Sequence, residues 1–112
     1  MPTYNKIEEL LEKLKELDPK TFDEWRYVYR GNWEGTEYSG VKLERTDLWL
    51  LQGVIQEAIA AWELSWDVYA VAGENVRGSI SLDKKKIDFS GCAATPTGAL
   101  LRAYVAALEA MR

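Results

Sequence analysis

The sequence predicts an α+β fold in which a small antiparallel β-sheet packs with α-helices. Two observations support this prediction. Three short segments of strand-like composition follow one another over residues 66–90, and turn residues separate them. Segments with apolar residues at helical spacing lie on both sides of them, at 46–62 and 96–111. The expected order of elements is α-(α/β)-α-β-β-β-α, in which the second element fits a helix or a strand.

The length of 112 residues predicts a single domain, 1–112, with one hydrophobic core. Within it, residues 1–45 are expected to form an N-terminal helix and an aromatic loop, and residues 46–111 a helix–sheet–helix core. Cys92 is the single cysteine of the chain, so an intramolecular disulfide is excluded and we expect a reducing cytosol.

The first helix is predicted from a stripe of apolar side chains that lies opposite a charged face. The stripe consists of Ile7, Leu10, Leu11, Leu14 and Leu17. Asp18-Pro19 ends this helix because proline cannot continue it, and Thr21 with Glu24 forms a capping box for a second, short helix. Residues 21–30 also alternate aromatic with other side chains, as in a strand. We favour the helix and keep the strand as the alternative.

A polar, glycine-rich loop is predicted for residues 31–40, and it contains two large rings, Trp33 and Tyr38. A longer helix follows from a cap at Thr46-Asp47. Its expected buried stripe consists of Leu48, Leu51, Ile55, Ala58, Ile59 and Trp62. The sheet comes next, with strands expected at about residues 66–72, 77–82 and 86–90, and turns at 73–75 and 83–85.

The final helix is expected to lie on the sheet. Thr95 is its predicted cap and Pro96 its first residue, and Cys92 takes a small apolar role just before it. Its apolar face consists of Leu100, Leu101, Tyr104, Val105, Leu108 and Met111. Alanines on the same helix let a neighbouring element approach closely.

Charge and hydropathy restrict the possible partners. The chain carries 14 Lys and Arg against 18 Asp and Glu, a net charge of −4. Because nucleic-acid binding needs a basic surface, no DNA binding is expected. The basic run at 84–86 follows Asp83 and fits an exposed hairpin turn. We find no signal-peptide core and no apolar segment long enough for a membrane, so we expect a soluble, cytoplasmic protein.

The residue types argue against catalysis. Histidine is absent, which removes the commonest general base and the commonest metal ligand, and leaves Cys92 without a histidine to activate it. The carboxylates Glu34, Glu37, Glu44 and Asp47 are close in sequence but match no metal-binding loop. No phosphate-binding glycine loop occurs either. We therefore predict a non-enzymatic protein with no catalytic residues, no metal and no cofactor.

A first candidate binding site lies in the predicted loop. Trp33 and Tyr38 are large rings in a polar setting, and Glu34 and Glu37 add negative charge beside them. Exposed aromatic residues are enriched at protein interfaces. This group predicts an aromatic and acidic patch that binds a protein partner.

A second candidate site is the start of the final helix, which predicts a phosphate-containing ligand instead. Thr95, Thr97 and free backbone N–H groups there can hold an anion, with Arg102 one turn further on. Arg26 and Arg30, which flank aromatic residues, are candidates for further phosphate contacts. Ordinary helix capping by Thr95 and Pro96 is the simpler interpretation of the same helix start.

Part of the chain resembles a known family of small phage proteins, the phage α-β-α sandwich domain. The resemblance rests on Ala60-Ala61-Trp62-Glu63 at the end of a helix, a short hairpin, and Ala93-Ala94-Thr95-Pro96 before an alanine-rich helix with Arg102-Ala103. It covers about residues 46–111. Family members usually have a small apolar residue and a cysteine beside that arginine, where this chain has Leu101 and Ala103. The resemblance implies a phage or prophage accessory protein and brings no established activity.

These observations together predict a non-enzymatic phage accessory protein in the host bacterial cytosol, which inhibits a bacterial defence system by binding a host protein. Sequestration of a signalling nucleotide of such a system is the alternative. In a third interpretation the protein is a structural homo-oligomer, in which the leucine-rich first helix packs on its twin.

Overall fold

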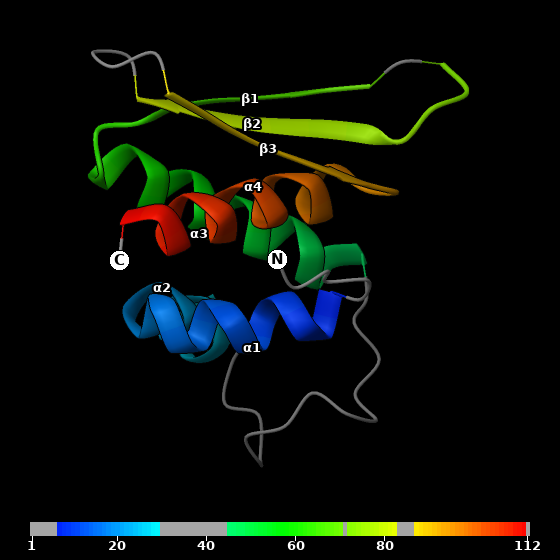
Figure 1. Ribbon diagram of the computed structural model, residues 1–112. Helices are drawn as coiled ribbons and strands as arrows, with labels where there is room; N and C mark the ends of the chain where they lie inside the picture. Colours follow the sequence, from blue (N-terminus) through cyan, green and yellow to red (C-terminus); the bar gives the residue numbers. More distant parts are fainter. Residues whose placement is uncertain (1–6, 30–44, 71, 83–86, 112) are drawn as a thin grey trace.

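The structure is a computed structural model that describes residues 7–29, 45–70, 72–82 and 87–111 (Figure 1). It confirms the α+β class, with α-helices and a three-stranded antiparallel sheet. In chain order the elements are α1 (Ile7–Leu17), α2 (Pro19–Asp23), the π-helix η1 (Glu24–Tyr29), α3 (Arg45–Ala61), β1 (Ser65–Tyr69), β2 (Val76–Leu82), β3 (Ile87–Ala93) and α4 (Pro96–Met111).

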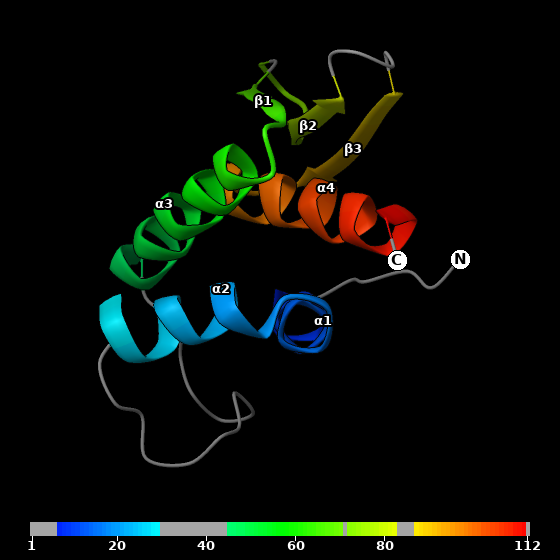
Figure 2. The same cartoon turned by 90° about the vertical axis from the view of Figure 1, so that its left-hand side faces the viewer.

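The elements form three layers, which are visible in both views (Figures 1 and 2). The sheet is the first layer, α3 and α4 form the second, and α1 with α2 and η1 form the third. The layer of α3 and α4 is therefore covered from both sides. This explains why α4 is apolar around most of its circumference, since a helix with such a surface is buried.

The sheet has the strand order β1-β2-β3, and its two faces differ in polarity. On the inner face, Ile80 is fully buried and lies opposite Trp66 on β1 and Phe89 on β3. On the outer face, Ser79 lies opposite Asp67 and Ser90, and its hydroxyl donates to Asp67 Oδ1 over 2.9 Å. This alternation is typical of an antiparallel sheet that packs on helices through one face.

Two glycines bring the sheet into close contact with α4, as the alanines of that helix predict. A Cβ atom on Gly78 would lie 2.8 Å from the carbonyl carbon of Ala99, and one on Gly91 2.7 Å from Cβ of Arg102. Gly78 and Gly91 are paired across β2 and β3. The strand β3 continues to Ala93, three residues past the predicted end, and Gly91 is a strand residue at a site of close backbone approach.

The core joins all three layers. The fully buried side chains include Leu11 and Leu14 from α1, Trp25 from η1 and Tyr104 from α4. The rings of Phe22 and Trp25 meet edge to face, with 6.1 Å between their centroids. Residues 21–29 are helical, so the strand alternative is wrong for them, and Trp25 packs in the core.

Several predicted boundaries need correction. The second helix begins at Pro19 with Asp18 as its N-cap, so the predicted capping box of Thr21 and Glu24 does not start it. The helix α3 begins at Arg45, just before the predicted cap. The strand β1 spans Ser65–Tyr69, and β2 begins at Val76.

Leu48 and Ala58 of the predicted buried stripe are half-buried, and three other side chains with predicted apolar roles are exposed. Trp62, assigned to the buried stripe of α3, is 51% exposed because α3 ends at Ala61 and the chain then turns through Glu63, whose φ is 58°. Met111 is 37% exposed at the last turn of α4. Cys92 is exposed on β3, where it pairs with Arg77 on the outer face, so its predicted small apolar role is wrong.

Candidate functional site

The aromatic and acidic patch predicted from the sequence lies outside the described residues. This applies to Trp33, Glu34, Glu37 and Tyr38, and also to Arg30 of the alternative ligand site. The patch therefore stays a prediction.

The start of α4 has the contacts of an ordinary helix cap. The Gly98 N–H donates to Thr95 Oγ1 over 3.1 Å, and the Ala99 N–H donates to the Thr95 carbonyl over 3.0 Å. Thr97 is buried, and its hydroxyl lies 3.0 Å from the Leu48 carbonyl and 2.9 Å from Gln52 Oε1. Thr95 thus caps its own helix, and Thr97 ties α4 to α3.

The two described arginines of the predicted ligand site belong to different layers. Arg102 belongs to the side of α4 that faces the sheet, where its Cβ meets Gly91. Arg26 is 3% exposed and belongs to η1, in the layer farthest from the sheet. The described contacts do not gather these arginines with Thr95 and Thr97 around one ligand position.

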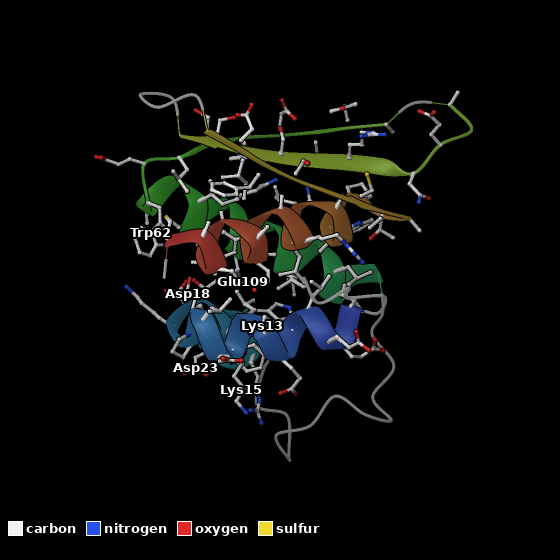
Figure 3. All side chains as sticks on the ribbon, in the orientation of Figure 1. Lys13, Lys15, Asp18, Asp23, Trp62 and Glu109 are labelled. Carbon is white, nitrogen blue, oxygen red and sulfur yellow. The ribbon has the colours of Figure 1, made fainter. Side chains whose placement is uncertain are left out.

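A groove at the opposite end of α3 is the better candidate site. It lies where the junction of α1 and α2 meets the end of α3, and Figure 3 shows Asp18 and Trp62 from these two elements at the same end of the molecule. We call it the α2–α3 groove. Its volume is about 510 Å³. Its lining residues are Asp18, Lys20, Thr21, Glu24, Glu57, Ala58, Ala61 and Trp62.

Asp18 is held in place by hydrogen bonds from two sides. Its Oδ1 accepts from the Thr21 N–H over 3.3 Å, which is the N-cap contact of α2. Its Oδ2 accepts from the hydroxyls of Thr21 and Tyr104, each over 2.5 Å. Because Tyr104 belongs to α4, the carboxylate joins the third layer to the second.

The Tyr104 hydroxyl donates its proton to Asp18 in this network. Burial raises the pKa of its hydroxyl far above the ordinary value of 10.0, and the hydrogen bond to Asp18 and the charge of that residue raise it further. Hydrogen bonds with Trp62 and Thr21 act in the opposite direction on the pKa. Tyr104 therefore keeps its proton at neutral pH, where it orients Asp18 and does not serve as a base.

The α2–α3 groove is acidic and partly aromatic. Asp18, Glu24 and Glu57 contribute three carboxylates, and Lys20 contributes one ammonium group. None of these three carboxylates forms an ion pair with another described residue. The half-exposed indole of Trp62 borders the same hollow, so the groove combines negative charge with an aromatic surface.

Sequence reasoning missed this site for two reasons. Trp62 continues the apolar spacing of α3 and was expected in the core, whereas its exposure follows from the end of the helix at Ala61. Asp18-Pro19 predicts a helix end, although Asp followed by Pro is also a typical N-cap and first-residue pair. That signal identifies the cap, but it does not identify Tyr104 as a partner.

Two other hollows among the described residues are less informative. One, of about 440 Å³, follows the exposed charged face of α1, where Lys13 and Glu16 form an ion pair over 3.5 Å. Another, of about 370 Å³, lies beside Trp49 and Pro96. A search of the described residues for three or more His, Cys, Asp or Glu side chains able to hold a metal ion finds no such group.

Comparison of the chain with protein-family models, with curated proteins and with solved structures finds no match. The resemblance to the phage α-β-α sandwich domain therefore stays a prediction. Among the described residues, no helix has the length and apolarity needed to cross a membrane.

Proposed function

We propose that the protein is a non-enzymatic binding protein that contacts another protein through the α2–α3 groove. The observation that carries this proposal is Trp62, whose indole is 51% exposed at the border of the groove. Tryptophan is enriched among the residues that dominate binding energy at protein interfaces, and a ring beside a pocket is their usual setting.

A binding role also agrees with the chemistry of the groove. The buried Tyr104, which donates to Asp18 from behind the groove lining, holds its proton at neutral pH, and the chain has no histidine to transfer one. Its carboxylate Asp18 is fixed by hydrogen bonds to Thr21 and Tyr104. A rigid, shaped surface of this kind lowers the entropic cost of association.

The resemblance to small phage proteins supplies the biological setting of the proposal. In that setting the protein lies in the host bacterial cytosol, and its partner is a host protein of a defence system. Binding inhibits the defence. A plating assay tests this: phage titres are compared on bacteria that carry single defence systems, with and without this protein expressed.

The binding surface is tested with a matched pair of variants. Trp62→Ala removes the indole at the groove, and Trp49→Ala removes an indole that is 63% exposed on α3, away from the groove. We expect that the host protein captured by the unchanged chain is lost with Trp62→Ala and kept with Trp49→Ala. Equal capture by all three proteins would overturn the proposal.

The two alternatives from the sequence receive no support from the described contacts. For a nucleotide ligand, Thr95 and Thr97 are already engaged within the fold. A thermal-shift screen still tests the nucleotide alternative, since a ligand at 100 times its Kd stabilises the folded protein by about 2.7 kcal/mol. For a homo-oligomer through the first helix, Leu10, Leu11 and Leu14 are buried within one chain, where α1 packs on α4.

A further inference from the structure

We propose that the α2–α3 groove receives an arginine side chain from a basic segment of the partner protein. This inference rests on the proposed function and specifies the chemistry of its contact. The guanidinium group would lie on the indole of Trp62 and face the carboxylates of Asp18 and Glu57. Four features of the groove support this occupant: its negative charge, the ring of Trp62, the acceptor geometry of Asp18 and its volume.

Charge complementarity favours a cation. The groove contains three carboxylates and one ammonium group, an excess of two negative charges. Since Asp18, Glu24 and Glu57 have no ion-pair partner among the described residues, this excess is not compensated within the described fold. An incoming cation therefore gains attraction without first having to break an existing ion pair.

The wall formed by α3 favours a cation with a flat, extended side chain. Trp62 provides the ring, and a cation above an indole face is attracted by its negative electrostatic potential. Ala58 and Ala61 line the same wall with small apolar groups, against which the methylene groups of a long side chain can pack. Arginine satisfies both features, because its planar guanidinium stacks on aromatic rings.

Asp18 is a preorganised acceptor for the guanidinium. Its three hydrogen bonds come from neutral donors, the Thr21 N–H and the hydroxyls of Thr21 and Tyr104, so none of them cancels its charge. Two of the three converge on Oδ2, which leaves Oδ1 with one unused acceptor position. A partner donor can bond there without displacing Tyr104.

The dimensions leave ample room for an arginine side chain. The volume of about 510 Å³ lies within the range of roughly 300–1,000 Å³ that is usual for ligand pockets. The groove lies between elements that the core holds together, since Thr21 and Ile59 beside it are buried. The site is thus formed before the partner arrives.

The test is a titration of the full-length protein with short blocked peptides, followed by NMR. The probes are an acetylated, amidated Gly-Arg-Gly peptide, its lysine analogue, and its citrulline analogue, which has the shape of arginine without the charge. The signals to follow are the indole N–H of Trp62 and the backbone amides of Ala58 and Ala61. We expect saturable shifts with the arginine peptide, weaker shifts with lysine and none with citrulline.

Variants connect the binding to the residues. Trp62→Ala should lower the affinity for the arginine peptide by about 2- to 30-fold, which corresponds to the usual strength of a cation–π contact. Trp62→Phe should lower it less, because a ring remains at the site. Glu57→Gln should lower the affinity for the arginine peptide several-fold. Glu74 is an exposed carboxylate in the turn before β2, so Glu74→Gln should leave the affinity unchanged. The affinity should also fall as salt is added.

The outcomes separate this inference from the proposed function. Two results overturn the arginine site and leave the proposed function standing. One is equal binding of the arginine and citrulline peptides. The other is the absence of a saturable shift with any peptide while Trp62→Ala still abolishes capture of the host protein. If capture does not depend on Trp62, the proposed function fails as well. A variant that loses the native NMR pattern is replaced by Trp62→Phe, which keeps a ring at the site.

Discussion

Replacing Tyr104 with phenylalanine tests the hydrogen bond that joins α4 to the junction of α1 and α2. The ring of Tyr104 is fully buried, and its hydroxyl donates to Asp18 Oδ2 over 2.5 Å. Phenylalanine keeps the ring and leaves no cavity of appreciable size, so the change removes the hydrogen bonds of the hydroxyl, which are the bond to Asp18 and those with Trp62 and Thr21. A hydrogen bond to a charged group contributes about 1.5–3 kcal/mol to the free energy of unfolding.

We therefore expect Tyr104→Phe to lower the free energy of unfolding by about 1.5–3 kcal/mol at pH 7. In a domain of this size, each kcal/mol of lost stability lowers the melting temperature by about 4 °C, so we expect a fall of roughly 6–12 °C. Urea unfolding at constant temperature measures the first quantity, and a thermal scan the second. A loss below about 0.5 kcal/mol, comparable to an ordinary surface substitution, would refute the reasoning.

The same pair of proteins tests the raised pKa of Tyr104. In the unfolded chain the hydroxyl ionises near pH 10, whereas in the folded state it keeps its proton above that pH. Its contribution to the free energy of unfolding is therefore complete below pH 10 and decreases as the pH rises further. At pH 11 the difference in stability between the unchanged protein and Tyr104→Phe should be smaller by about 1.4 kcal/mol than at pH 8. A difference that does not change with pH would show that Tyr104 ionises equally in both states.

Three substitutions test the packing of α3 and α4, each by the urea midpoint of unfolding. Gly91→Ala should destabilise by about 1–3 kcal/mol, since the new Cβ would lie 2.7 Å from Cβ of Arg102, and an unchanged midpoint would contradict the close approach. Gly53→Ala is the matched control: no atom lies within 4 Å of its new Cβ, and α3 should gain about 0.5–1 kcal/mol. Thr97→Val should cost about 1 kcal/mol, because the bond to the Leu48 carbonyl is lost, and a neutral result would show that this bond does not tie α4 to α3.

Local patterns were sufficient to predict the elements and much of the core. The apolar spacing in the first helix identifies Leu10, Leu11 and Leu14, which are all buried. Thr95 and Pro96 mark the start of α4, where the cap is observed. These signals involve residues at most four positions apart, so a short window of sequence contains them completely.

The candidate site could not be predicted in the same way. The contact between Asp18 and Tyr104 joins residues 86 positions apart, and no local pattern pairs them. Trp62 follows the spacing of the buried Ile55 and Ile59, so periodicity assigns it to the core. Its exposure depends on where α3 ends and on which neighbouring elements cover that end.

The sequence by itself determined the types of element, their order and the apolar faces of the helices, because spacing, caps and turn residues act over a few positions. The tertiary structure decided which faces meet. It placed Gly78 and Gly91 against α4, connected Asp18 to that helix, and left Trp62 beside a groove that no other described element fills. The physical reason is that burial is a property of the packed layers: a side chain is exposed or covered according to elements that are distant in the chain.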